Sequence, residues 1–237
     1  MQPLTSEVKQ AFLENGYVIL ADHLEPDELA QLRGICDDLL AEPPDDDEGG
    51  KGHDIGRGHD RRFLRHRHKD KPELASFVLG PGMRDLVSPV VGARPHLFNE
   101  QFVVKGPRTG ASFAWHQDSG YVGFGHKPYL TVWIALDDTT VENGAVYILP
   151  RDLRRDMSVS EHRRDEAGKE LVGYDGDEPG VPAIVSAGSI VLFSSVTLHR
   201  SSANTTARPR RAFVAQYSGV PIIDPITQRP KTFATPL

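Results

Sequence analysis

Hydrophobic positions in the first part of the chain repeat with the period of an α-helix. Apolar residues at helical spacing end at Gly16, which predicts a first helix, and the β-branched run at 17–20 then indicates a short strand. A second helix is predicted to begin at Pro26 and to continue over 27–41. Apolar residues recur there about every 3.6 positions, and proline is favoured in a first helical turn. A weaker helical pattern covers 73–90.

From residue 94 onward the pattern changes to short β-rich segments separated by Gly, Pro, Asn and Asp. These segments recur roughly every 10–20 residues, which is typical of antiparallel sheets and differs from the strand–helix alternation of parallel sheets. Residues 152–180 carry many charges and no period, so we expect an insertion loop there. The β-rich segments lie at 96–105, 112–118, 128–138, 145–150, 189–199 and 210–220.

The fold class predicted from these patterns is mainly β. We expect a double-stranded β-helix, the jelly roll of cupin-like proteins, with the N-terminal helices packed on one sheet. The chain is expected to form a single domain over 1–237. Its parts are a helical N-terminal part with a loop (1–93), a jelly-roll core (94–220) and a C-terminal tail (221–237).

A strongly charged stretch separates the predicted helices. Residues 42–48 carry five acidic side chains, and residues 51–71 carry eight Lys or Arg against three Asp. A charged run of this kind usually forms a solvated loop, and a mobile lid over an anionic substrate is the alternative.

Composition narrows the classes of function. The single cysteine, Cys36, excludes a disulfide framework, a cysteine-rich zinc site and an iron–sulfur cluster. A net charge of −6 gives no reason to expect nucleic acid or an anionic membrane as a partner. Because no apolar run approaches roughly 18 residues and no signal-peptide pattern opens the chain, we expect a cytoplasmic protein. The sequence does not indicate its oligomeric state.

Candidate chemistry begins with His116 and Asp118. Residues two apart on a strand point to the same side, so both side chains would face one cavity. An imidazole and a carboxylate suit a divalent first-row metal, and one more histidine would complete the 2-His-1-carboxylate set of non-haem Fe(II) oxygenases. Similar pairs at 23–25 and 68–70 lack a strand pattern that would orient them.

His199 is the candidate third ligand, because a strongly β-forming run ends there. A turn-rich segment and another strand follow, so His199 is expected on the strand adjacent to Arg210 and Arg211. A buried guanidinium is costly unless it meets an anion, and its planar donors match a carboxylate. A dicarboxylate held by a metal at one end and by either arginine at the other explains the set, and 2-oxoglutarate is such a molecule.

The sequence resembles the phytanoyl-CoA dioxygenase branch of the Fe(II)/2-oxoglutarate-dependent oxygenases. The resemblance covers most of the chain and is carried by FLENGYVILADHLEPDELAQL, WHQD, LTVWIALDDTTVENGAVYILP, AGSIVLF and LHRSSANTTARPRRA. The chain departs from the family at 151–153, where Arg-Asp-Leu replaces the usual Gly-Ser/Thr-His.

The resemblance implies an iron site and a pocket for 2-oxoglutarate, with O2 as the second cosubstrate. His116, Asp118 and His199 match the family's Fe(II) ligands. Arg210, eleven residues after His199, matches the partner of the distal carboxylate of 2-oxoglutarate, which selects it over Arg211. Other pocket residues implied by the resemblance are Ser201, Trp133 and Gln101, with Thr131 on the strand face of Trp133. Phe113 and Tyr121 are candidates for substrate contact.

The activity implied is that of a dioxygenase that oxidises an unactivated C–H bond of a small-molecule metabolite and releases succinate and CO2. Related halogenases have Gly or Ala at the position of Asp118, so the carboxylate favours hydroxylation, desaturation, epoxidation or cyclisation. Two alternatives remain: a cupin-type metal dioxygenase or isomerase that does not use 2-oxoglutarate, and a catalytically silent binding protein of the same fold.

Overall fold

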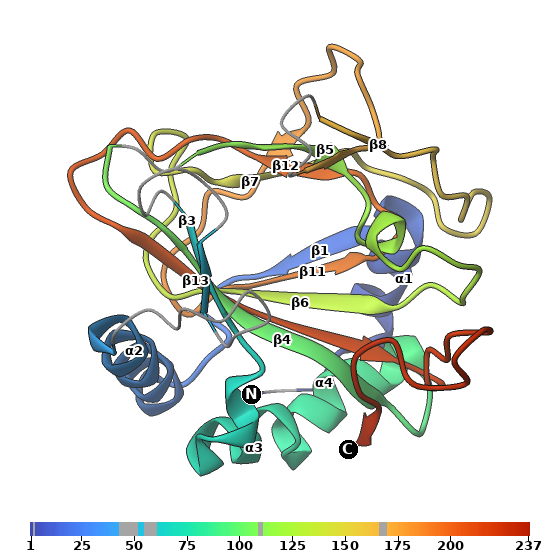
Figure 1. The fold of residues 1–237 in the computed structure, drawn as a ribbon, viewed down its shortest axis with the longest axis horizontal. Coiled ribbons are helices and arrows are strands. Elements are labelled where there is room, and N and C mark those ends of the chain that lie inside the picture. Colours follow the sequence, from blue (N-terminus) through green and yellow to red (C-terminus); the bar gives the residue numbers. More distant parts are fainter. Residues whose placement is uncertain (2, 43–51, 55–60, 109–110, 166–169) are drawn as a thin grey trace.

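The computed structural model describes the chain except for residues 2, 43–51, 55–60, 109–110 and 166–169. Its described strands form two facing antiparallel sheets, and helices cover the outer face of one of them (Figure 1). This is the predicted jelly roll with N-terminal helices on one sheet. The large sheet contains, in spatial order, β1 (Tyr17–Leu20), β11 (Ile190–Ser194), β6 (Leu130–Ala135), β13 (Arg210–Ser218), β4 (His96–Lys105), β3 (Arg61–Arg65) and β2 (Gly52–Asp54), and β14 (Thr235–Pro236) also pairs with β4.

The small sheet lies opposite the large one and is built from short strands. Its spatial order is β10 (Val181–Pro182), β7 (Val146–Ile148), β12 (His199–Ser201) and β5 (Phe113–His116). The space between the two sheets is where side chains from both can meet, and every candidate site residue lies on a strand or turn that borders it.

In Figure 1 most of the helices form a third layer below the large sheet, and the first helix lies at the right-hand end of the sheet. The first helix, α1 (Ser6–Asn15), ends at Gly16, whose φ of 77° is left-handed and therefore favours glycine. The second, α2 (Pro26–Ala41), begins with a capping box between Glu25 and Glu28. The predicted helix at 73–90 is two helices, α3 (Pro72–Val78) and α4 (Pro81–Val91), because Pro81 cannot donate the backbone hydrogen bond that would continue α3.

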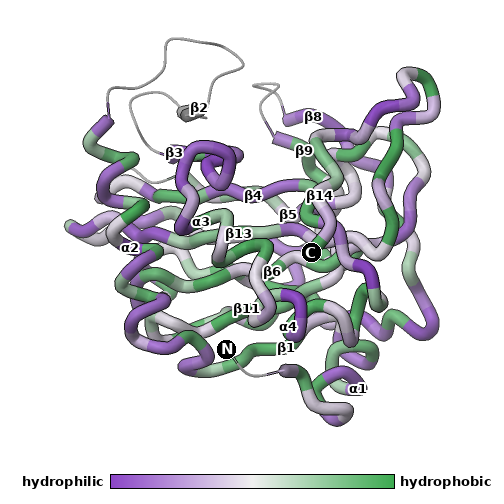
Figure 2. Tube along the Cα trace, turned by 90° about the horizontal axis from the view of Figure 1, so that it is seen from below, coloured by the Kyte–Doolittle hydropathy of each residue, from purple (hydrophilic) through white to green (hydrophobic). Residues whose placement is uncertain are grey.

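The main hydrophobic core lies between the helices and the large sheet. Leu130, Val132 and Ile134 point from β6 toward the helices and are fully buried, whereas Thr131 and Trp133 face the small sheet. Both faces of the sheet are therefore covered, which explains why every residue of β6 is buried. Figure 2 shows hydrophobic stretches along the strands of the large sheet and hydrophilic ones in the outer loops.

The β-rich run at 189–199 differs from the prediction, because it forms two strands in different sheets. Strand β11 ends at Ser194, and β12 begins at His199 in the small sheet. Between them, Ser195 Oγ accepts the Tyr129 N–H and Thr197 Oγ donates to the Gly16 carbonyl. Side chains that bond to backbone groups in this way compete with a strand ladder and end it.

The basic segment at 51–71 is not a solvated loop or a lid where the structure describes it. Residues 61–65 form β3, which pairs with β4 in the large sheet. Arg61 is buried and bonds to Glu170, and the buried His68 ring lies 2.9 Å from Glu100 Oε1. Residues 51 and 55–60 lie outside the described part, as do 43–48 of the preceding acidic run.

The predicted insertion loop contains a short hairpin of β8 (Arg163–Arg164) and β9 (Leu171–Val172). The segment expected as a C-terminal tail returns to the large sheet, where Thr235 pairs with Leu97 of β4. No helix in the described ranges is both long and apolar enough to cross a bilayer.

Candidate metal centre

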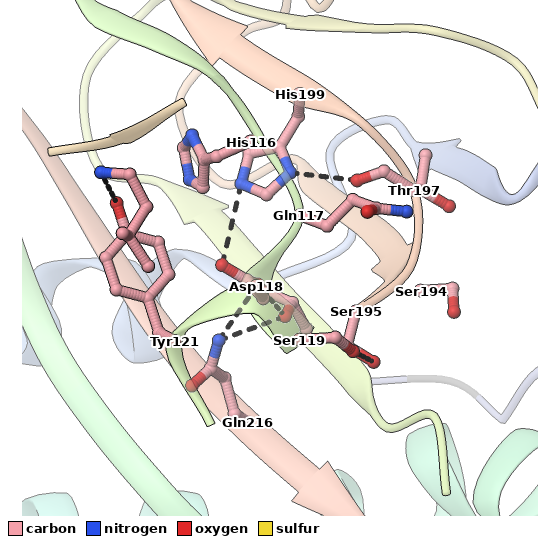
Figure 3. Close-up of polar contacts among 12 residues, drawn as sticks. His116, Gln117, Asp118, Ser119, Tyr121, Ser194, Ser195, Thr197, His199 and Gln216 are labelled. Atoms are coloured by element: carbon pink, nitrogen blue, oxygen red, sulfur yellow. Dashed lines mark hydrogen bonds and ion pairs between the residues drawn. The ribbon is translucent and has the colours of Figure 1, made fainter. Parts of the chain in front are cut away.

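His116, Asp118 and His199 converge at one end of the small sheet, as predicted. Strands β5 and β12 pair with His116 directly opposite His199, and the two imidazole centroids are 4.2 Å apart. β5 ends at His116, so Asp118 lies at the start of a 3-10 turn, η2 (Asp118–Tyr121), and still faces the histidines (Figure 3). One potential ligand atom from each of the three lies within 4.8 Å of the others.

Both histidines are held in the tautomer that a metal requires. The Nδ1 atoms of His116 and His199 donate to the carbonyls of Ala114 and Thr197, at 2.8 and 3.1 Å. In the neutral form of each ring, Nε2 is therefore the nitrogen that can bind a cation. Burial, and secondly the neighbouring His199, lowers the pKa of His116 to about 3, so this ring is neutral at physiological pH.

The carboxylate of Asp118 is held by hydrogen bonds to one of its two oxygens. Oδ2 accepts from Thr131 Oγ1 at 2.6 Å and from Gln216 Nε2 at 2.9 Å. Oδ1 faces His199 Nε2 at 3.6 Å, so these two atoms point to the same place for a metal (Figure 3). Gln216 is itself fixed by Asn99 at 2.9 Å, and Asn99 by His66 at 3.0 Å. Thr131 therefore lies in the predicted cavity, but its hydroxyl donates to the metal ligand.

This supporting network was not predicted from the sequence. Asn99 and Gln216 face each other across β4 and β13. The available signal was the polar run 99–101 in the middle of β4, because Asn99 and Gln101 share the strand face that lines the cavity.

Arg210 is the arginine that enters the space between the sheets. Its side chain is 1% exposed, and Nη2 donates to the Gly144 carbonyl at 2.9 Å, whereas Nε and Nη1 have no partner among the described residues. Burial lowers its pKa only to about 10, so the guanidinium stays charged at neutral pH. Arg211 points to the other face and pairs with Asp137 and Asp37, at 2.7 and 2.6 Å.

The position of Arg210 corrects one expectation. His199 and Arg210 do not lie on adjacent strands; they lie on facing sheets, because β12 belongs to the small sheet and β13 to the large one. Between them is a cavity of about 110 Å³. Its lining includes all the predicted ligands and cosubstrate residues, namely His116, Asp118, His199, Arg210, Ser201, Trp133, Gln101 and Thr131, together with Phe113.

The backbone conformation and close contacts at Gly144, just before β7, require a glycine. Its φ is +93°, and a Cβ there would lie 2.7 Å from the Ser202 carbonyl oxygen and 2.9 Å from the Lys105 side chain. Only a residue without a side chain fits between Ser202 and Lys105 at this φ, and in this position its carbonyl accepts from Arg210.

A family model described as phytanoyl-CoA dioxygenase (PhyH) matches residues 12–212, which is most of the chain. The chain belongs to the phytanoyl-CoA dioxygenase family. It is an Fe(II)/2-oxoglutarate-dependent dioxygenase, and the three convergent ligands and the buried cation with unpaired donors fit the two groups that this class uses.

Similar proteins extend the comparison. A phytanoyl-CoA dioxygenase domain-containing protein 1 homolog from Caenorhabditis briggsae is 24% identical, with 88% of each chain covered. The 2-aminoethylphosphonate dioxygenase of uncultured bacterium HF130_AEPn_1 is 30% identical over 61% of this chain and 54% of its own length. Among solved structures, EvdO2 from Micromonospora carbonacea var. aurantiaca, complexed with 2-oxoglutarate, is 25% identical. Its TM-score is 0.75, with 96% of this chain and 97% of EvdO2 covered.

The departure from the family at 151–153 has a structural role. Arg151 donates to the carbonyls of Val196 and Ser158, both at 2.7 Å, and its Nη2 pairs with Asp156 at 2.5 Å. The side chain of Gln117, between His116 and Asp118, donates to the same two carbonyls. Arg151 therefore fixes the start of the following loop to the turn that carries the chain toward β12.

A second, larger cavity of about 320 Å³ adjoins the metal centre. Phe113 and Tyr121, the candidates for substrate contact, both line it, and the Tyr121 ring centroid lies 5.6 Å from that of His116. Asp118 and His116 are also part of its wall, so a molecule in this cavity would lie beside the metal ligands.

Proposed function

We propose that the chain binds Fe(II) through His116, Asp118 and His199 and uses 2-oxoglutarate and O2 to oxidise an unactivated C–H bond of a small-molecule metabolite. Succinate and CO2 would be the products of the cosubstrate. The observation that carries the proposal is the convergence of this triad on the same cavity as the buried, partly unpaired guanidinium of Arg210.

Each protein group has a distinct task in this reaction. The two Nε2 atoms and one carboxylate oxygen provide three ligands and leave the remaining positions around the metal for 2-oxoglutarate and O2. Arg210 orients 2-oxoglutarate by charge-assisted hydrogen bonds to its distal carboxylate, with Ser201 at the same wall. Fe(II) held by these three side chains would supply the redox chemistry that activates O2. Trp133, below the guanidinium at 5.6 Å, excludes water from it.

A small molecule is the substrate that the second cavity favours. Its volume of about 320 Å³ suits a metabolite-sized ligand, and its lining mixes aromatic rings with a few polar groups. The names of the relatives support the same size class, since 2-aminoethylphosphonate is a small metabolite. The carboxylate at Asp118 favours hydroxylation or another oxidative outcome over halogenation.

The test is 2-oxoglutarate-dependent release of succinate after O2 is added to protein that was reconstituted with Fe(II) under anaerobic conditions. Asp118→Ala should abolish it, and Asp177→Ala, at an exposed position, is the matched control. Arg210→Gln should raise the dissociation constant of 2-oxoglutarate by at least about 30-fold, the cost of breaking a buried charge pair. Arg211→Gln should not. Equal succinate release by the parent and Asp118→Ala, or O2 uptake that does not need 2-oxoglutarate, would contradict the proposal.

A further inference from the structure

Arg65 is a cation in the wall of the second cavity, and no carboxylate among the described residues pairs with it. It lies at the end of β3, opposite Gln101 of β4, and its Nε donates to Gln101 Oε1 at 3.1 Å. Its two terminal amino groups make no hydrogen bond or ion pair with any residue that the structure describes. The guanidinium packs over the Phe63 ring at 5.3 Å, which restricts where it points.

The acidic groups of this cavity are already engaged. Asp118 belongs to the metal centre, and Glu170 accepts from Arg61 and from the Ala114 N–H. Lys231 adds a second positive charge to the wall. Its Nζ donates to the Val122 carbonyl at 2.8 Å and forms no ion pair in the described part of the chain. It interacts electrostatically with Asp224, which does not line the cavity. The cavity therefore holds two cations that its own acids do not neutralise.

The Arg65 guanidinium is only partly buried, so its free donors are open to the cavity. Loss of hydration lowers its pKa. A guanidinium with two free terminal amino groups offers the fork geometry that matches the paired oxygens of a carboxylate, phosphate or phosphonate.

We propose that Arg65 binds an anionic group of the substrate, which is therefore a carboxylate, phosphate or phosphonate with an apolar part. Lys231 contributes long-range attraction, while Phe98 and Tyr121 contact the apolar part. This inference rests on the proposed function, because it concerns the substrate of the same metal centre.

The site at Arg65 is separate from the one at Arg210. Gln101 lines both cavities and stands between the two arginines along the sheet, and its side-chain oxygen is already used by Arg65. The cosubstrate carboxylate at Arg210 and the substrate anion at Arg65 would thus occupy different cavities.

The experiment is a succinate-release screen with a library of matched pairs. Each pair contains a carboxylate, phosphate or phosphonate and the neutral amide or dialkyl ester of the same skeleton. We expect the compounds that stimulate 2-oxoglutarate turnover to be anions. For these, Arg65→Gln should raise KM by about 10- to 100-fold, the range for loss of a hydrogen bond to a charged group. Arg65→Lys should retain part of the affinity, and Arg94→Gln, at an exposed position, should match the parent.

Three results would overturn the inference: preferential stimulation by a neutral member of the pairs, no stimulation by any anion, or an unchanged KM in Arg65→Gln. Comparing carboxylates with phosphonates identifies which anion the site prefers. Calorimetric titration of 2-oxoglutarate into the parent distinguishes the two proposals. A parent that does not bind 2-oxoglutarate contradicts the proposed function, whereas one that binds it and prefers neutral compounds contradicts only this inference.

Discussion

Gln216 offers a direct test of how the metal centre is supported, because it contacts a ligand without being one. Its Nε2 donates to Asp118 Oδ2 at 2.9 Å, and its Oε1 accepts from Asn99. Gln216→Leu removes one of the two donors to this carboxylate oxygen and leaves the Asn99 amide without its acceptor. The Asp118 side chain then loses part of what fixes Oδ1 toward the metal.

The expected magnitude follows from the type of bond. A hydrogen bond to a charged group contributes about 1.5–3 kcal/mol, and loss of an outer partner of a metal ligand costs about 10- to 100-fold in metal affinity. We expect the dissociation constant of Fe(II) to rise by that factor. Thr131→Val removes the other donor, at 2.6 Å. Because Gln216 Nε2 also lies 3.2 Å from Thr131 Oγ1, the double variant should lose less than the sum of the two effects.

The assay is an anaerobic titration of Fe(II) against a competing chelator, with the free energy of unfolding measured on the same samples. Gln31→Leu, the same substitution at an exposed position of α2, is the control and should bind Fe(II) like the parent. The reasoning is refuted if Gln216→Leu remains as stable as the parent and its dissociation constant for Fe(II) changes by less than about twofold.

Three further predictions concern groups around the centre. Gly144→Ala should lower the free energy of unfolding by several kcal/mol, roughly 2–4, because a Cβ at φ +93° meets backbone; urea unfolding measures this. Burial lowers the pKa of Lys105 from 10.5 to about 6, so the unfolded chain binds more protons between these values. The stability of metal-free protein should therefore rise from pH 6 to pH 9 more steeply than that of Lys105→Met. Arg151→Met should speed amide hydrogen exchange at Ser158 and leave α2 unchanged.

The parts of the site that could be predicted are those whose residues lie a short, characteristic distance apart in the sequence. His116 and Asp118 lie two apart, and a family motif places Arg210 eleven residues after His199, so local sequence was sufficient for both. The run at 189–199 shows the limit. Its residues are β-forming throughout, but the change of sheet depends on Thr197 meeting Gly16, a contact across 181 residues that no local pattern encodes.

The prediction of a solvated loop at 51–71 was wrong for a related reason. The sequence pattern indicated solvent exposure for Arg61 and His68 because their partners are remote in the chain. Glu170 lies 109 residues from Arg61, and Glu100 lies 32 residues from His68. A buried charge becomes acceptable only when its partner is in place, and that depends on the completed sheet. The prediction of helices was more accurate, since caps such as the one at Glu25 lie within the helix's own sequence.

The register of β13 against β4 determines where the functional side chains lie on the inner face of the large sheet. Arg210 lies opposite Lys105, Val214 opposite Gln101, and Gln216 opposite Asn99. The cosubstrate cation and the support of the metal carboxylate are thus six residues apart on one strand face. A slip of one residue would turn all of these positions toward the helices and bring Arg211 into the cavity.

The pairing of β13 with β4 contains one register shift, and it lies beyond the residues of β13 that line the cavity. The register of β13 against β4 shifts between Gln216 and Tyr217, so that Tyr217 pairs with Leu97. Tyr217 is fully buried, and its hydroxyl donates to the Val78 carbonyl at the end of α3. Every functional position of β13 precedes the shift, and the residue after it anchors the helical layer. The bulge therefore lets one strand serve the metal centre over most of its length and the hydrophobic core at its end.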